Sequence, residues 1–197
     1  MIEKLSNKFE AKDDTFKKAQ YDMCQAYANG SIGVIVSGLI WLITSFISHQ
    51  YSPSKAIGTL FFGGMFIFPL SMLLCKSIGL SGTHTKGNPL GNLAMEGTIL
   101  MMMCLPLALG LSIQQKEWFF QAMLLIIGGR YLTFATIYGK KVYWILGTLL
   151  GISALILFKL KVQSLGSLLT GSCIEISFGL FMLISFRRDN KKSQQFY

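Results

Sequence analysis

Long apolar runs separated by short polar segments dominate the chain. Six of these runs approach or reach the roughly 20 residues that a helix needs to cross the hydrocarbon core of a bilayer. They cover residues 31–49, 56–75, 93–113, 118–138, 142–158 and 164–186. Segment 76–92 is rich in Gly, Ser, Thr, Asn and Pro and is predicted to be a loop, whereas the other connections are short. The pattern predicts an all-α fold, an integral membrane bundle of six transmembrane helices.

The segment before the first run has a different pattern. Apolar residues recur there every seven positions, which on a helix places them in one stripe flanked by lysines and acids. The stripe contains Ile2, Phe9, Phe16 and Met23, with Leu5, Ala19 and Ala26 alongside. It predicts an amphipathic cytoplasmic helix on the membrane surface or against the bundle. A partner-binding coiled coil is the alternative, although Lys12 interrupts the seam.

These patterns divide the chain into three parts. Residues 1–28 form the amphipathic N-terminal helix, residues 29–188 the six-helix transmembrane domain, and residues 189–197 a basic C-terminal tail. Within the transmembrane domain, pairs of small residues at four-residue spacing predict close helix contacts. The pairs are Gly33 with Ser37, Gly147 with Gly151, and Ser167 with Gly171.

The distribution of Lys and Arg predicts the orientation, because these residues are retained on the cytoplasmic side. Four of the 18 lie on one side of the predicted spans, Arg130 lies within a span, and the remaining 13 lie on the other side. The larger group comprises Lys4, Lys8, Lys12, Lys17, Lys18, Lys76, Lys86, Lys140, Lys141, Arg187, Arg188, Lys191 and Lys192. Both termini are therefore predicted to be cytoplasmic.

Composition and charge indicate which class of partner the protein contacts. Only 14% of the residues are charged, against about 25% in an ordinary soluble domain. The formal net charge of +9 comes from cations at the edges of the apolar runs, where anionic lipid headgroups lie. Membrane lipids are the predicted partners, and nucleic acid is not.

Metal and catalytic signals are weak. The four cysteines show no CxxC spacing, and His49 and His84 are placed on opposite sides of the membrane by the predicted topology. No HExxH, GxSxG or phosphate-loop pattern occurs. We predict no metal site, no cofactor and no catalytic residue.

Three ionisable residues fall within the predicted spans: Glu96, Arg130 and Glu175. At a rise of 1.5 Å per residue, Arg130 lies about 12 Å and Glu175 about 16 Å from the predicted cytoplasmic ends of their helices. Glu96 is shallower and on the same side. A charge inside a membrane is costly and normally faces a partner or a wet cavity.

This placement has two interpretations. Arg130 and Glu175 form a structural ion pair that fixes how the helices dock, or they line a polar cavity that opens to the cytoplasm. In the second case Tyr131 and Tyr138 are candidate lining residues, and the guanidinium would bind an anionic group or a glutamate would carry a proton. The sequence leaves both interpretations open.

Two stretches, "NPLGNL" (88–93) and "GGRYLTFATIYGKKVYWILG" (128–147), resemble a family of small bacterial multi-helix membrane proteins catalogued as a domain of unknown function. The resemblance extends from about residue 20 to residue 160. It implies a polar N-terminal helix, a Tyr-rich fourth membrane helix and a location in the bacterial inner membrane. It implies no reaction.

We therefore expect a protein that binds or transports a small solute or lipid through the polar site at Glu96, Arg130 and Glu175. A non-catalytic accessory protein, whose N-terminal helix recruits a partner, is the alternative. An integral-membrane lipid enzyme built on Glu96, Glu175 and His84 comes third. A homo-oligomer is compatible with all three. The halves of the sequence show no similarity of the kind that an inverted-repeat transporter would have.

Overall fold

The computed structural model describes the backbone of residues 2–195 and the side chains of residues 14–191. That part of the chain is all-α, as predicted. Its elements are α1 (Ile2–Tyr27), a 3-10 turn η1 (Ala28–Gly30), α2 (Ser31–Gln50), α3 (Pro53–Ser77), α4 (Pro89–Gln114), α5 (Lys116–Tyr138), α6 (Val142–Lys159) and α7 (Ser164–Gln195).

Six helical segments are long and apolar enough to cross a membrane. They are Asp14–Gln50, Pro53–Ser77, Pro89–Gln114, Lys116–Tyr138, Val142–Lys159 and Ser164–Lys191. Each contains one predicted span, so the six predicted spans correspond to six helices that could cross a membrane, as in a multi-pass membrane protein. The first segment begins at Asp14 and includes the second half of α1, so the N-terminal helix is itself part of a candidate span.

Local sequence explains where several of these helices begin and end. The side chain of Ser52 accepts a hydrogen bond from the backbone N–H of Lys55 at the start of α3 (3.3 Å), and that of Asn88 accepts one from Leu90 at the start of α4 (3.0 Å). In both helices a proline follows the cap, where its missing N–H costs nothing. The end of α5 is Gly139 with φ 62°, a left-handed conformation that glycine adopts without strain.

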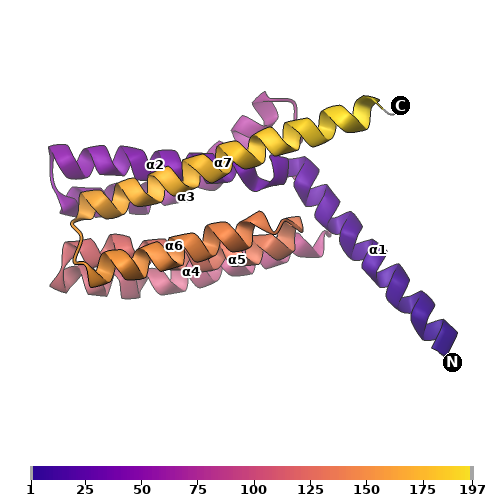
Figure 1. Cartoon of the computed structure of the whole chain (residues 1–197), viewed down its shortest axis with the longest axis horizontal. Coiled ribbons are helices and arrows are strands. Elements are labelled where there is room, and N and C mark those ends of the chain that lie inside the picture. Colours follow the sequence, from indigo (N-terminus) through magenta and orange to yellow (C-terminus); the bar gives the residue numbers. More distant parts are fainter. Residues whose placement is uncertain (1, 196–197) are drawn as a thin grey trace.

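The membrane helices form two layers (Figure 1). Helix α2 packs against α3 and α7 in one layer, and α5 packs against α4 and α6 in the other. Contacts of α7 with α5 and α6 join the layers. Because the last helix belongs with the first two, the layers are not consecutive halves of the chain, and the sequential three-plus-three arrangement of many transporters is not followed.

Glycines permit the closest helix contacts in both layers. A Cβ atom at Gly128 of α5 would lie 2.7 Å from the carbonyl oxygen of Gly147 in α6. A Cβ atom at Gly38 of α2 would lie 2.9 Å from the backbone nitrogen of Ile176 in α7. Gly147 and Ser37, both members of predicted small-residue pairs, therefore lie at or beside real helix contacts.

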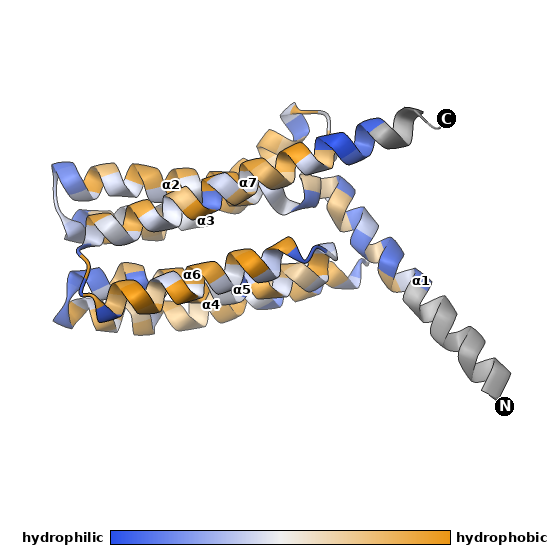
Figure 2. Ribbon diagram, in the orientation of Figure 1, coloured by the Kyte–Doolittle hydropathy of each residue, from blue (hydrophilic) through white to orange (hydrophobic). Residues whose placement is uncertain are grey.

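The outward surface of the bundle is apolar, as lipid requires. Figure 2 shows hydrophobic residues along all the membrane helices and hydrophilic residues at their ends and on α1. Large exposed side chains include Phe46, Phe62, Phe66, Phe68, Met103, Leu107, Trp144 and Ile145. The most exposed helix is α4, in which only 6% of the most apolar window is buried.

Helix α1 leaves the bundle at an angle, with its N-terminal end far from the membrane helices (Figure 1). Its predicted stripe is used unevenly. Met23 and Ala26 are each only 2% exposed, whereas Phe16 is 41% exposed. The side chains of Ile2, Leu5 and Phe9 lie outside the described residues. At the other end of the chain, the predicted tail from residue 189 continues α7 as far as Gln195.

Candidate functional site

Glu175 is the most deeply buried acidic residue described, with 0% exposure. It lies on α7 where this helix meets α2 and α5. The hydroxyl of Tyr131 donates a hydrogen bond to its Oε1 atom (3.1 Å), and Ser37 of α2 hydrogen bonds with the same carboxyl group. Its Oε2 atom is buried without a hydrogen-bond partner. Gly38 makes room, since a Cβ atom there would lie 3.1 Å from the Glu175 Cβ.

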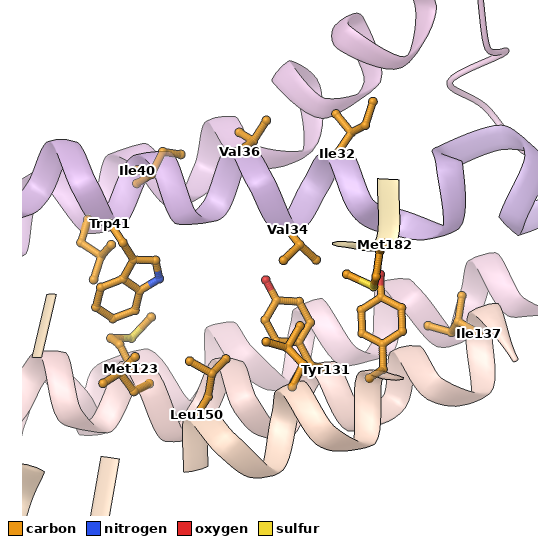
Figure 3. Close-up of a cluster of buried hydrophobic side chains, with 14 of the residues drawn as sticks. Ile32, Val34, Val36, Ile40, Trp41, Met123, Tyr131, Ile137, Leu150 and Met182 are labelled. Atoms are coloured by element: carbon orange, nitrogen blue, oxygen red, sulfur yellow. The ribbon is translucent and has the colours of Figure 1, made fainter. Parts of the chain in front are cut away.

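Tyr131 reaches Glu175 by crossing from one layer to the other. Figure 3 shows it in the core between α5 and α2, near Val34. Its side chain is only 5% exposed, and its ring lies among other buried side chains. The hydroxyl also hydrogen bonds with Ser37. Glu175, Tyr131 and Ser37 thus form a small polar group enclosed by three helices, which we call the inner polar group.

Arg130 faces a different neighbour. Its Nη2 atom donates a hydrogen bond to the hydroxyl of Thr98 on α4 (3.0 Å), and its Nη1 atom lies 3.8 Å from the sulfur of Met101. Its guanidinium carbon lies 5.3 Å from the centre of the Phe134 ring, a cation–π contact. The buried Nε atom has no hydrogen-bond partner. Arg130 is half-buried at the contact between α4 and α5.

The ion pair between Arg130 and Glu175, one of the two interpretations left open by the sequence, does not occur among the described side chains. Among the described side chains, the ion pair within 4.0 Å joins Lys140 and Asp189, not these two residues. Consecutive residues on a helix point about 100° apart. Arg130 therefore points toward α4 while Tyr131 points toward α7. The predicted similarity in depth agrees with the structure, because Tyr131, the neighbour of Arg130, touches Glu175.

Glu96 lies apart from the inner polar group and from the residues that contact Arg130. Its side chain is exposed on α4. Thr98 and Met101, which contact Arg130, lie on one face of this helix. Each residue of a helix advances the direction of the side chain by about 100°, so the side chain of Glu96 points more than a third of a turn away from both. The structure therefore places Glu96 outside the polar group that contains Glu175.

Tyr138 belongs to a cluster of aromatic rings next to the inner polar group. Its ring is stacked on Tyr143 of α6, with centroids 5.5 Å apart and planes at 23°. Phe134 packs edge-on against Tyr131, Tyr138 and Tyr143, with centroid distances of 5.6, 5.7 and 5.5 Å. We call these four rings the aromatic cluster. Arg130 contacts this cluster at Phe134, and Tyr143 of the cluster contacts Asn29 nearer the end of the bundle.

The aromatic cluster supports an unusual turn between α1 and α2. Ala28, Asn29 and Gly30 all have positive φ, at 51°, 57° and 76°. A left-handed conformation costs a non-glycine residue roughly 1–2 kcal/mol. The Tyr143 hydroxyl donates a hydrogen bond to the carbonyl oxygen of Asn29 (2.7 Å), which stabilises the turn. A Cβ atom at Gly30 would lie 2.7 Å from the Tyr138 ring, so glycine is required there on two grounds.

The second half of α1 is held to the loop between α3 and α4. The Asp22 carboxylate accepts hydrogen bonds from the Thr85 backbone and hydroxyl (3.0 and 2.9 Å) and from the Asn88 amide (2.8 Å). Tyr27 and His84 also form a hydrogen bond (3.0 Å). Asn88, the first residue of the Asn-Pro-Leu-Gly motif, thus caps α4 and binds α1 at the same time.

Two cavities lie at the end of the bundle where α7 extends beyond the apolar core. One, of about 250 Å³, is lined by Ile78, Leu80, Leu183, Phe186, Arg187, Asn190 and Lys191. The other, of about 190 Å³, is lined by Asn29, Lys140, Lys141, Val142, Phe181, Met182, Ser185 and Asp189. Arg130 and Glu175 line neither of them.

The described residues contain no group of three His, Cys, Asp or Glu side chains placed to hold a metal ion. Cys24, Cys75, Cys104 and Cys173 are all free thiols. His84 is bound to Tyr27 in the loop, far along the chain from Glu175, and His49 lies in the last turn of α2.

Several residues of the site carried no sequence signal of their own. Ser37 was recognisable only as a small residue, and Thr98 and Tyr143 only as polar residues within apolar runs. Their roles depend on which faces of the helices meet. Asp22 lies beside the predicted apolar stripe of α1, and nothing in the sequence indicated that the loop would fold onto it.

A family model covers residues 16–185, from the second half of α1 to the last turns of α7 within the apolar core. It describes a family of unknown function, DUF7010. The chain belongs to this family. The resemblance expected from residues 88–93 and 128–147 is therefore confirmed as far as a family of unknown function whose model covers most of the chain. No curated protein and no solved structure matches the chain. For this DUF7010 protein, function has to be argued from the arrangement of its own side chains.

Proposed function

We propose that this DUF7010 protein binds a small anionic solute or a lipid headgroup at Arg130, as the first step in holding or moving it within the membrane. The observation that supports the proposal is the incomplete set of partners around the guanidinium. An arginine side chain has five N–H donors. Within the described residues, Arg130 has one oxygen acceptor, the Thr98 hydroxyl, and a long contact to a sulfur atom.

A charged guanidinium inside a bilayer is costly without an anionic partner. Carboxylate and phosphate groups match its planar donor geometry and form the strongest hydrogen bonds with it. Arg130 is only half-buried, and it lies where α4 and α5 meet the exterior of the bundle. An anionic group could therefore approach it from the bilayer between these helices, without entering the core.

The inner polar group lies next to the proposed site, on another face of α5. Glu175 and Tyr131 lie one helix face away from Arg130, and the rings of Tyr138 and Tyr143 lie between them and the end of the bundle that is cytoplasmic in this proposal. A fully buried carboxyl group with one unpartnered oxygen is suited to exchange a proton with a neighbour. In this proposal Glu175 is the proton-carrying residue of the sequence hypothesis, while Glu96 lies outside the site.

The orientation belongs to the same proposal. The excess of Lys and Arg at the end that carries both termini supports a cytoplasmic location for that end. A location in a bacterial inner membrane, which the resemblance of residues 88–93 and 128–147 implied, is part of this proposal. On this orientation, Arg130 and Glu175 lie in the cytoplasmic half of the bundle.

An accessory, partner-binding function is the second candidate, and one observation favours it. The first half of α1 projects away from the bundle, and residues 14–18 of this helix are exposed (Figure 1). A projecting helix with an apolar stripe can bind another helix. In that case Arg130 and Glu175 only stabilise the fold.

Charged thiol reagents distinguish the two candidates. We consider Thr98→Cys in a protein whose four native cysteines are replaced by alanine. If Arg130 forms an anion-binding site, a negatively charged methanethiosulfonate should modify this cysteine at least several-fold faster than a positively charged one of similar size. Arg130→Gln should remove the preference.

The matched control is Ile99→Cys, because Ile99 is the next residue on α4 and its side chain is 51% exposed on the apolar surface. It should react slowly with both reagents and show no dependence on Arg130. Equal rates for the two reagents at Thr98→Cys, or a preference that survives Arg130→Gln, would reject an anion-binding site and favour the accessory function.

A further inference from the structure

The larger cavity is separate from the site at Arg130, and its lining residues follow a regular pattern along α7. Five of its seven lining residues lie on α7: Leu183, Phe186, Arg187, Asn190 and Lys191. Their spacing is that of one helix face. The two apolar residues come first along the helix and the polar and charged residues follow, so the face changes from apolar to cationic as α7 leaves the apolar core.

The two lining residues outside α7 are also apolar. Ile78 and Leu80 follow directly after α3 and complete the floor with Leu183 and Phe186. The seven lining residues include two cations and no acid. The acid on α7 nearest to them, Asp189, lines the other cavity and is paired with Lys140 at 4.0 Å. Nothing among the lining residues neutralises Arg187 and Lys191.

From this juxtaposition we infer that the cavity is a binding site for the headgroup of an anionic phospholipid. The phosphate lies between Arg187 and Lys191, and the start of an acyl chain lies on Ile78, Leu80 and Leu183. Basic pockets at the ends of membrane helices recognise anionic headgroups through this combination of charge and apolar contact.

The polar residue of the face adds a neutral donor. The Oδ1 atom of Asn190 accepts a hydrogen bond from Gln25 of α1 at 3.5 Å. Because its Oδ1 atom faces Gln25, its amide N–H₂ group is the part of Asn190 that would donate to a phosphate or glycerol oxygen. At about 250 Å³ the cavity is smaller than the roughly 300–1,000 Å³ of typical small-molecule sites. It thus holds a headgroup and the beginning of one chain, while the rest of the lipid stays in the bilayer.

Native mass spectrometry of the full-length protein in detergent tests this site. The probes are phosphatidylglycerol and phosphatidylcholine with identical acyl chains. In the Arg130→Gln background, which removes the other proposed anion site, we expect one saturable phosphatidylglycerol molecule per chain and markedly weaker binding of phosphatidylcholine. Because each cation near an anionic surface contributes about 1 kcal/mol, the double variant Arg187→Gln with Lys191→Gln should weaken phosphatidylglycerol binding about 30-fold.

The matched control is Arg188→Gln with Lys86→Gln. It removes two exposed cations from the same end of the protein, and neither residue lines either of the two cavities described above. This variant should bind phosphatidylglycerol like the wild type. An equal loss in both double variants, or equal binding of the two lipids by the wild type, would overturn the proposal in favour of diffuse attraction. Displacement of the lipid by inorganic phosphate at similar concentration would overturn it in favour of a free-phosphate site.

A second variant separates the cavity from its charge. Leu183→Trp fills the apolar floor and leaves both cations in place, so it should also weaken phosphatidylglycerol binding. If it lowers thermal stability, Ile78→Trp makes the same test from a half-exposed position at the end of α3. Unchanged binding in the variant that stays folded would show that the cavity is not used. Arg130→Gln should not affect this binding, so failure here and failure of the proposed function are distinguishable.

Discussion

At the scale of single residues, the inner polar group shows how a carboxyl group is accommodated in the core of a membrane bundle. Glu175 is not neutralised by the arginine at the same depth. It receives hydrogen bonds from the neutral hydroxyl of Tyr131 and from Ser37. If a buried carboxyl group loses such a donor, the folded state is destabilised by more than the net contribution of one hydrogen bond. The reason is that the desolvation of the carboxyl group is then uncompensated. The Tyr131 hydroxyl should therefore matter to stability.

Tyr131→Phe should lower the free energy of unfolding by roughly 1–3 kcal/mol, because it leaves the buried Glu175 with fewer donors. Thermal unfolding in detergent at fixed pH measures this loss. Tyr21→Phe is the control, because Tyr21 is 66% exposed on α1, and its effect should be close to zero.

The double variant Tyr131→Phe with Glu175→Leu gives a sharper test of the same contact. It removes both polar partners, so its cost should be smaller than the sum of the two single losses. Fully additive losses would mean that the hydrogen bond contributes nothing, and the role of the inner polar group would have to be sought in function alone.

At the scale of helices, close contact between backbones determines which faces meet. The contact of α5 with α6 depends on one glycine of a neighbouring pair. A Cβ atom at Gly128 would collide with the backbone of α6, whereas one at Gly129 would have nothing within 4 Å. The two glycines are adjacent in sequence and differ only in the face of α5 on which they lie.

Gly128→Ala should destabilise the protein by roughly 1–3 kcal/mol, the usual cost of overpacking, because α5 and α6 would have to move apart. Gly129→Ala should be neutral or slightly stabilising, since alanine is the better helix former. Thermal unfolding of the two variants under the same conditions checks the difference. Similar losses in both would indicate that helix propensity or lipid contact, rather than backbone packing, decides the effect.

The sequence predicted the helices but not their rotation. Six apolar runs are visible because a span must be long and apolar, and the caps at Ser52 and Asn88 are local signals. The spans are apolar on nearly all sides, so the pattern does not indicate which side faces lipid. For this reason the depth of Arg130 and Glu175 was predictable from counting residues, whereas the partner of each was not.

At the scale of the whole molecule, the charges and the termini concentrate at one end of the bundle. Thirteen of the 18 Lys and Arg residues belong to that end by the predicted topology. Both described ends of the chain, α1 and the extension of α7, lie there (Figure 1). The two cavities lie at this end as well. In the orientation proposed above from the positive-inside rule, this end faces the cytoplasm.

Cysteine labelling of intact cells with a membrane-impermeant reagent should therefore modify Ser52→Cys and Gln115→Cys but not Lys86→Cys. Lys86 is preferable to its neighbour Thr85 because Thr85 is bound to Asp22, whereas Lys86 is exposed in the loop. Permeabilised cells provide the control, in which Lys86→Cys should react. Labelling of Lys86→Cys in intact cells would reverse the orientation and with it the cytoplasmic placement of both proposed sites.

The pairing of α2 with α7 has a consequence for how the protein is made. These helices share the most extensive contact in the bundle, yet they are the first and last membrane spans of the chain. During synthesis α2 enters the bilayer long before α7 exists. The face of α2 around Gly38, with its buried serines and threonine, therefore has no α7 to pack against at first. Neighbouring spans such as α2 with α3, or α5 with α6, can associate in the order of translation, but the core can close only when nearly the whole chain has been made.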